Sequence, residues 1–184
     1  MPDSVSVVAL AGRRIDAPGT LPPRFPAANI GLVEGRIRSV FEHGVSVLVC
    51  SAACGADLLA LGVAGEWGIR RRVVLPFDRA RFRETSVVDR PGDWGTRYDQ
   101  ILDEVEANGD LIVLGCDPAD PEAYAEANRA ILDEAVRLGA FARRSVSAVV
   151  LWDLETRGAD DFVAHFLGEA SIRNLPVEQI DTST

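Results

Sequence analysis

Short apolar runs alternate along the chain with longer segments in which apolar residues recur every three or four positions. The short runs have the length of strands and occupy residues 5–11, 45–50, 72–77, 111–116, 145–152 and 177–180. The longer segments have the helical period and occupy residues 29–43, 58–67, 93–108, 120–139 and 160–172, with a shorter helical piece at 82–88. Strands covered on both faces must be continuously apolar, and these runs are. The pattern therefore predicts an α/β fold, a doubly wound and mainly parallel sheet of about six strands.

The elements form one series, which predicts a single domain over residues 1–184. This length is usual for one compact domain, and no repeat, low-complexity stretch or linker interrupts the series. The segment after the first strand carries Pro18, Pro22, Pro23 and Pro26. Four prolines within nine residues exclude a helix interior, so this segment is expected to be a loop. We expect the end of the chain, residues 180–184, to be frayed.

The charged residues narrow the classes of partner and of chemistry. The 28 acidic residues outnumber the 19 basic ones, so the formal net charge is −9. An acidic surface repels phosphate backbones, and nucleic acid is therefore not the expected partner. All 19 basic residues are arginine. A Schiff-base lysine, a lysine-anchored pyridoxal cofactor and a lysine-bearing P-loop are thereby excluded.

The three cysteines, Cys50, Cys54 and Cys116, are too few for a secreted disulfide framework. No second pair of Cys or His lies near Cys50 and Cys54 to complete a zinc site, so we expect neither a metal nor a cofactor. The N-terminal segment has no basic stretch followed by an apolar region, and no apolar run is long enough to cross a bilayer. We therefore expect a cytoplasmic protein that does not contact membranes.

Three turns that follow predicted strands are candidates for a ligand site. They cover residues 12–14, 51–57 and 157–160, and each combines glycine with small or polar residues. In a parallel sheet of this kind, ligands bind at the carboxyl ends of the strands, where the strand order reverses. Glycine lets the backbone approach a ligand closely, and the N-terminus of a following helix favours an anion such as phosphate. The candidate ligand-binding residues are Gly12, Arg13, Arg14, Ser51, Ala52, Gly55, Ala56, Asp57, Asn128, Asp153 and Gly158.

For several of these side chains, the sequence allows two different roles. Arg13 or Arg14 suits bidentate binding of a phosphate, and the alternative is an ion pair on the surface. Asp57 suits the cap or first turn of a helix, or a hydrogen bond to ribose hydroxyls. Asn128 either reaches the site or satisfies a backbone carbonyl group. Asp153 ends a strand at the same edge and is a further candidate for ligand contact.

Several motifs resemble those of the SLOG superfamily, which unites LOG-type proteins with the Smf/DprA proteins of DNA uptake. Residues 9–14, Ala-Leu-Ala-Gly-Arg-Arg, resemble its Gly-x-Arg turn. Residues 51–60, Ser-Ala-Ala-Cys-Gly-Ala-Asp-Leu-Leu-Ala, are similar to its second signature. The segments 74–77, 124–128 and 150–153 are similar to a bacterial subgroup. The resemblance covers nearly the whole chain and implies a Rossmann-like domain that binds a nucleotide or nucleotide-derived ligand.

One motif departs from the catalytic members of that superfamily. The LOG enzymes, which are cytokinin riboside phosphoribohydrolases, carry Pro-Gly-Gly-x-Gly-Thr-x-x-Glu after a late strand. The corresponding residues here are 156–162, Thr-Arg-Gly-Ala-Asp-Asp-Phe, which keep one glycine and lose the threonine. The catalytic motif is therefore not intact, although Asp160 and Asp161 lie close to the position of its glutamate.

Three functions follow from these observations. The first is a sensor that binds ADP-ribose, an NAD-like molecule or a mononucleotide and acts through an effector protein, with a homodimer as the expected assembly. The second is a nucleotide N-glycosidase, which needs a carboxylate beside the ribose. Its candidate catalytic residues are Asp57, Asp160 and Asp161, with Asp153 as a further carboxylate. The third is DNA binding of the Smf/DprA type, which the net charge of −9 opposes.

Overall fold

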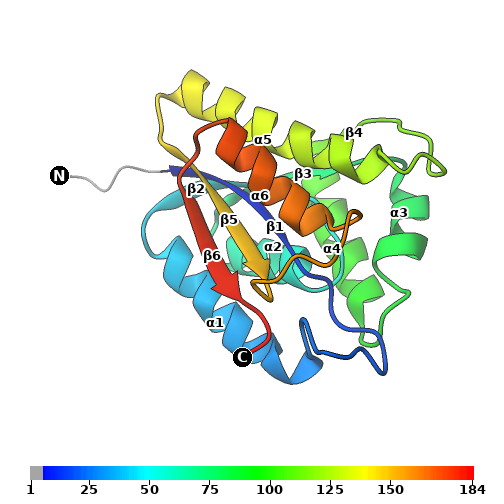
Figure 1. Ribbon diagram of the computed structural model, residues 1–184. Helices are drawn as coiled ribbons and strands as arrows, with labels where there is room; N and C mark the ends of the chain where they lie inside the picture. The colour runs from blue at the N-terminus through cyan, green and yellow to red at the C-terminus, as the bar shows by residue number, and fades with distance from the viewer. Residues whose placement is uncertain (1–5) are drawn as a thin grey trace.

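The computed structural model describes residues 6–184 and joins six strands in one sheet. The strand order is β4-β3-β2-β1-β5-β6, and every neighbouring pair is parallel (Figure 1). The predicted doubly wound α/β fold is therefore confirmed, and it is Rossmann-like. The strands are β1 (Ser6–Gly12), β2 (Val45–Cys50), β3 (Arg70–Leu75), β4 (Leu111–Val113), β5 (Val146–Trp152) and β6 (Val177–Asp181).

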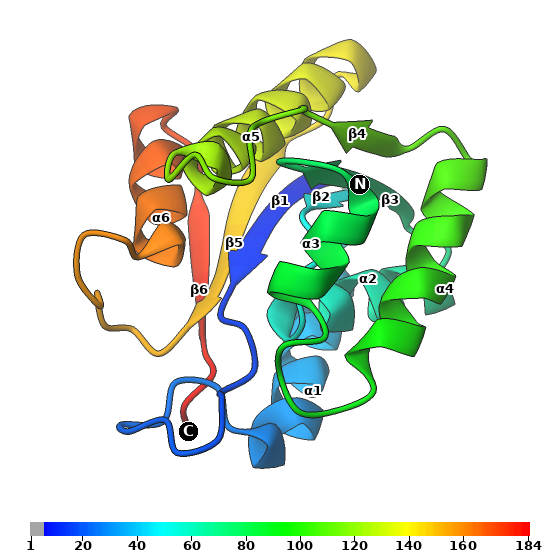
Figure 2. The same cartoon turned by 90° about the vertical axis from the view of Figure 1, so that its right-hand side faces the viewer.

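Helices cover both faces of the sheet. In Figures 1 and 2, α5 and α6 lie on one face, and α1, α2 and α4 lie on the other. The short helix α3 follows β3 and lies beside the carboxyl ends of the strands. The helices are α1 (Ile30–Phe41), α2 (Ala56–Glu66), α3 (Arg79–Ser86), α4 (Trp94–Ala107), α5 (Ala123–Ala142) and α6 (Phe162–Ile172), with a 3₁₀ turn at Ala27–Asn29. Among the residues that the structure describes, no helix is both long and apolar enough to cross a membrane.

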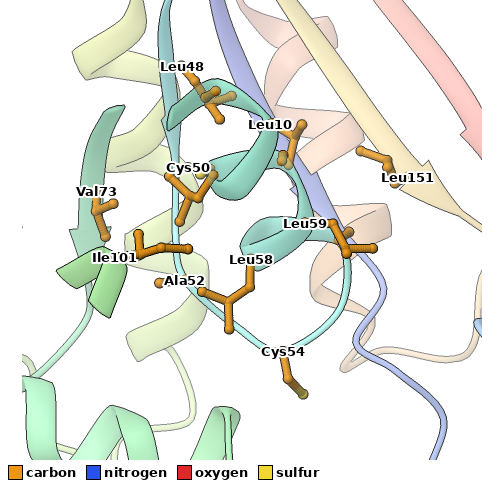
Figure 3. Packing of buried hydrophobic residues seen from close by; sticks show 14 of the residues in the cluster. Leu10, Leu48, Cys50, Ala52, Cys54, Leu58, Leu59, Val73, Ile101 and Leu151 are labelled. Atoms are coloured by element: carbon orange, nitrogen blue, oxygen red, sulfur yellow. The ribbon is translucent and has the colours of Figure 1, made fainter. Parts of the chain in front are cut away.

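The side chains of β1 show why the strands are continuously apolar. Val8 and Leu10 pack in the cluster formed with α1, α2 and α4, whereas Val7 and Ala9 pack in the cluster formed with α5 and α6. Successive side chains of a strand point to opposite faces, so a strand between two helix layers needs apolar residues at every position. Figure 3 shows part of the first cluster, with Leu10 of β1 and Leu58 of α2 among its members.

Helix α2 is the most enclosed helix near the edge of the sheet where the carboxyl ends of the strands meet, which we call the carboxyl edge. Eight of its eleven residues are buried, because the helix contacts the sheet as well as α1 and α4. A helix enclosed in this way has apolar residues around its whole circumference. The exception is Asp57, which lies in the first turn and is buried as well. The burial of α2 therefore places a carboxyl group in an apolar layer at the edge where ligands bind.

The order of the strands creates a crevice beside β1. Strands β1 to β4 follow one another in one direction across the sheet, and the chain then returns to place β5 on the other side of β1. At such a reversal, the connections that leave neighbouring strands diverge to opposite faces, and a crevice opens at the carboxyl ends. The loops that follow β1 and β5 border this crevice.

The end of the chain differs from the prediction of a frayed tail. Thr182 is fully buried, and its backbone N–H donates to the Trp152 carbonyl group (3.0 Å). Its hydroxyl donates to the Arg24 carbonyl group (2.6 Å), and its own carbonyl group accepts from the Asn29 side chain (3.0 Å). The prediction of fraying is therefore wrong at Thr182, which has partners in β5 and in the loop after β1 that the sequence pattern does not show. Ser183 and Thr184 donate to Asp181 within the tail itself.

Smaller differences concern the ends of elements. Strand β3 begins at Arg70 and ends at Leu75, two residues earlier than predicted. Helix α5 begins at Ala123, three residues after the predicted start at residue 120, and the Asp120 carboxylate accepts from the Glu122 N–H within the preceding turn. These shifts move no candidate site residue to another edge of the sheet.

Candidate functional site

A cavity of about 550 Å³ lies at the carboxyl edge of the sheet. It is lined by the loops after β1 and β2, the first turn of α2, helix α3 with the loop that follows it, and the N-terminal parts of α5 and α6. Its volume is within the usual range of small-molecule sites, about 300–1,000 Å³. Among the predicted residues, those that line the cavity are Gly12, Arg13, Arg14, Ser51, Asp57, Asn128, Asp160 and Asp161.

Gly12 and Gly55 hold the loop after β1 against the N-terminus of α2. A Cβ atom on Gly12 would collide with Ala56 and would lie 2.8 Å from the Leu151 carbonyl oxygen. A Cβ atom on Gly55, whose φ is +98°, would lie 2.8 Å from the Arg13 carbonyl oxygen. Both positions therefore require glycine, because backbone meets backbone there.

This packing changes the expected role of the α2 N-terminus. The Ala56 N–H donates to the Arg13 carbonyl group (3.1 Å), so this amide is used within the protein. Ala52, Gly55 and Ala56 are buried and do not line the cavity. All three were predicted as ligand-binding residues, with Gly55 and Ala56 at the phosphate, and none of them borders this cavity. They allow the turn after β1 to pack closely against the N-terminus of α2, and neighbouring residues form the cavity wall.

Arg13 joins the loops at the crevice and is almost completely paired. Its Nε donates to Asp153 (2.8 Å), and its two terminal nitrogens donate to the two oxygens of Asp161 (2.7 and 2.8 Å). A further bond reaches the Glu155 carbonyl group (2.8 Å), so four of its five N–H groups are engaged. Only 7% of Arg13 is exposed. The guanidinium group thus clamps the loop after β5 to β1 and is not available as the phosphate ligand that the sequence suggested.

The two carboxylates of this network are also fully engaged. Asp161 caps α6 by accepting from the N–H groups of Val163 and Ala164 (both 3.1 Å). Burial alone would raise the pKa of Asp153 and of Asp161. Hydrogen bonds from Arg157 and Arg13 outweigh it for Asp153, and those from Arg13 and from backbone amides outweigh it for Asp161, so both pKa values are lowered. Both groups are therefore ionised structural partners, not free acids or bases.

Of the predicted residues in the region after β5, Asp153 and Gly158 lie outside the cavity wall, whereas Asp160 lies on it. Asp153 bonds Arg13 and Arg157 and does not line the cavity. Gly158 is exposed with φ of +96° and also lies outside the cavity wall. Asp160 lines the cavity and is exposed. Of this region, Arg157, Asp160 and Asp161 thus border the cavity, and the glycine makes a turn outside it.

Four buried polar atoms distinguish this cavity from the rest of the described chain. Within residues 6–184, the buried side-chain atoms without a hydrogen-bond partner are Nε of Arg14, Oγ of Ser51, Oδ1 of Asp57 and Nε of Arg90. All four residues line the cavity. Leaving such a group without a partner costs about 1–3 kcal/mol, so each of these atoms needs a partner from a ligand or from water in the cavity. Their occurrence around one cavity is typical of a site for a polar ligand.

Asp57 combines burial with one unpartnered oxygen. Its Oδ2 accepts from the Ala53 N–H (3.2 Å), as a first-turn acid can, while Oδ1 has no partner. Burial raises the pKa of Asp57 to about 7, and the Ala53 amide and the charge of Arg14 oppose this rise only in part. A carboxyl group that changes charge near neutral pH is suited to accept or donate a proton.

Aromatic rings form the wall contributed by α5 and α6. The ring centroids of Tyr124 and Phe162 are 5.3 Å apart, and both residues line the cavity. The Tyr124 hydroxyl group shares a hydrogen bond with Ser86 of α3 (2.9 Å). Asn128 lines the same wall, but its amide donates to the Phe162 carbonyl group (2.7 Å), the second of its two possible roles. This wall presents flat apolar surface beside a few polar groups.

Sequence reasoning missed several residues of the cavity wall. Arg24 and Arg90 lie in loops without a motif. Tyr124 lies in the segment 124–128 and Phe162 ends the segment 156–162, but neither was named as a site residue. Ser86 was not named as a site residue either. Neither protein-family models nor curated proteins match this sequence in the comparisons made.

Proposed function

We propose that this protein binds a nucleotide-derived ligand, such as a mononucleotide, ADP-ribose or an NAD-like molecule, in the cavity at the carboxyl edge. The observation that carries the proposal is the set of four unpartnered polar atoms on the cavity wall. Two belong to guanidinium groups, which suit phosphate oxygens. The other two, on Ser51 and Asp57, suit the hydroxyl groups of a sugar.

Two further features support a nucleotide over a simple sugar phosphate. The rings of Tyr124 and Phe162 offer a surface on which a base can stack. The cavity lies where the strand order reverses, the usual ligand position in doubly wound sheets. The resemblance to SLOG domains supports a sensor role, with an effector protein as partner and a homodimer as assembly.

The first test is mass spectrometry of small molecules released from the purified protein. The second is thermal unfolding with AMP, ADP, ADP-ribose and NAD, because a ligand at 100 times its Kd stabilises the folded state by about 2.7 kcal/mol. Ser51→Ala should reduce this stabilisation. Arg81→Gln is the control, since Arg81 is exposed on α3 and does not line the cavity. Unfolding that none of these compounds alters, with no nucleotide released, would refute the proposal.

Asp57 favours a second candidate, the hydrolysis of an N-glycosidic bond. Its pKa of about 7 and its unpartnered oxygen in the cavity are what a general acid or base requires at neutral pH. Asp161 is the weaker candidate, because its carboxylate is engaged by Arg13 and by the amides of α6. The test is release of free base from nucleoside monophosphates and NAD. Base release that Asp57→Asn abolishes would support an enzyme, and the absence of any base release would exclude one for these substrates.

A further inference from the structure

The arginines that line the cavity are not equivalent. Arg13 pairs with Asp153 and Asp161, and Arg157 pairs with Asp153 and Glu155. Arg14 pairs with Asp89 in the loop after α3. In the chain from residue 6 onward, neither Arg24 nor Arg90 has a carboxylate oxygen within 4 Å of its guanidinium group. These two residues therefore bring positive charge to the cavity that the protein does not neutralise by pairing.

Arg24 is held in place by its backbone. Its N–H donates to the Asp16 carboxylate (3.0 and 3.3 Å), and its carbonyl group accepts from the buried Thr182 hydroxyl (2.6 Å). The turn after β1 and the end of the chain thus anchor this residue from two sides. Arg24 lines the cavity, and its side chain is free of ion pairs among the described residues. A fixed backbone with an unpaired cation is a pre-organised arrangement for binding an anion.

Arg90 comes from a different loop, between α3 and α4. Both views of the ribbon show this loop beside the loop after β1 (Figures 1 and 2), and the Arg14–Asp89 pair joins the two. The Nε atom of Arg90 is buried without a partner while the residue lines the cavity. A buried guanidinium N–H that no protein group accepts is a donor left for a ligand.

The negative charge of the whole chain makes the two unpaired arginines, Arg24 and Arg90, more significant. The protein has a net charge of −9, so most of its surface disfavours anions. The glycine turns at Gly12 and Gly55 and the Ala56 amide, where a phosphate was expected from the sequence, are occupied by contacts between β1 and α2. Among the described residues, the guanidinium groups without an ion pair that remain for an anion in the cavity lie in the loops after β1 and after α3.

We propose that Arg24 and Arg90 together bind the phosphoryl group of the ligand. The inference rests on the proposed function in taking the anion to be the phosphate of a nucleotide. It locates that phosphate at the two loops and not at the N-terminus of α2. It also defines the class of ligand, because an uncharged nucleoside would leave both guanidinium groups without an acceptor.

The experiment measures the Kd of AMP and of adenosine by titration calorimetry for wild type, Arg24→Gln, Arg90→Gln and the control Arg81→Gln. Each cavity variant should weaken AMP binding by about 10- to 100-fold, as expected for a lost hydrogen bond to a charged group, and leave adenosine binding unchanged. Arg81→Gln should behave as wild type, since this arginine pairs only with exposed Glu84. Urea unfolding checks that the variants are folded. AMP binding of wild-type strength in both cavity variants would overturn the inference.

A second measurement separates this inference from the proposed function. Phenylglyoxal modifies arginine, and the chain has no lysine to complicate the reaction. Pyrophosphate should protect Arg24 and Arg90 from modification, detected by peptide mass spectrometry, and should not protect Arg81. Protection without any nucleotide binding would leave the anion site standing and refute the proposed function. Nucleoside binding without protection by pyrophosphate or AMP would refute the anion site alone.

Discussion

Replacing Asp57 by asparagine should stabilise the folded protein at pH 8 while it weakens ligand binding. The carboxyl group is buried in the first turn of α2, one oxygen accepts from the Ala53 N–H, and the other has no partner. The titratable groups near it are Arg14, whose charge favours its ionisation, and the thiol of Cys50, which stays neutral because burial raises its pKa. Asparagine has the same shape, keeps an oxygen for the Ala53 amide and carries no charge. The variant therefore removes the cost of a buried charge without creating a cavity.

The size of the effect follows from the raised pKa. The unfolded chain releases the Asp57 proton near the ordinary value of 3.8, and the folded protein releases it near 7. Because the folded pKa is raised, the contribution of this group to stability is complete below pH 3.8 and is lost as the pH rises to about 7. Each pH unit in this window corresponds to about 1.4 kcal/mol. Between pH 5 and pH 8, wild type should therefore lose roughly 2–3 kcal/mol relative to the asparagine variant.

The assay is urea unfolding of wild type and Asp57→Asn at pH 5, 6, 7 and 8, compared at equal m values. The difference in the free energy of unfolding should grow with pH up to about 7 and then remain constant. Asp160→Asn is the matched control, since Asp160 borders the same cavity and is exposed, and it should leave the wild-type pH dependence unchanged. A constant difference across this range would show that Asp57 is ionised throughout, and the argument from burial would be refuted. Ligand affinity of the variant should fall by about tenfold.

Three further changes test the architecture around the cavity. Arg13→Gln should lower the free energy of unfolding by about 3–5 kcal/mol at pH 7, because the buried Asp161 loses its cation and the buried Asp153 keeps only Arg157. In urea unfolding this loss should shrink below pH 3.8, where the two carboxylates become protonated, and a loss independent of pH would contradict the ion-pair explanation. Gly12→Ala should cost about 1–3 kcal/mol in the same assay, because its Cβ collides with Ala56, and a neutral result would mean that the α2 N-terminus shifts freely. Thr182→Val should cost only about 1 kcal/mol but should weaken AMP binding measurably, since its hydroxyl anchors the loop that carries Arg24; unchanged binding would show that this anchor does not position the loop.

The layer architecture could be predicted because its cause is local. A strand that is apolar at every position must be covered on both faces, and helices in the connections supply that cover. The side chains of β1 confirm this reasoning, since Val8 and Leu10 pack to one face and Val7 and Ala9 to the other. The order of the strands did not follow from the pattern. The strand order depends on which strands lie side by side in the folded chain, and the apolar pattern does not specify this.

The candidate site could be predicted as a region but not in its details. Gly12, Ser51 and Asp57 line one cavity because the carboxyl ends of parallel strands meet at one edge. The role of Arg13 was misread, because its partners Asp153 and Asp161 lie about 140 residues away in the sequence. A motif shows that an arginine follows a strand, and it does not show which carboxylates surround that arginine.

The sequence by itself determined the class of fold, the edge of the sheet at which the cavity lies, and the exclusion of lysine chemistry, because periodicity and residue type are properties of the chain. Only the tertiary structure decided which polar groups are engaged and which remain without a partner. The Arg13 carbonyl group accepts from the Ala56 N–H, whereas no carboxylate of residues 6–184 pairs with the guanidinium groups of Arg24 and Arg90 at the cavity. The physical reason is that many hydrogen bonds and ion pairs join groups distant in sequence, so the neighbours of a side chain in space settle whether it is available to a ligand.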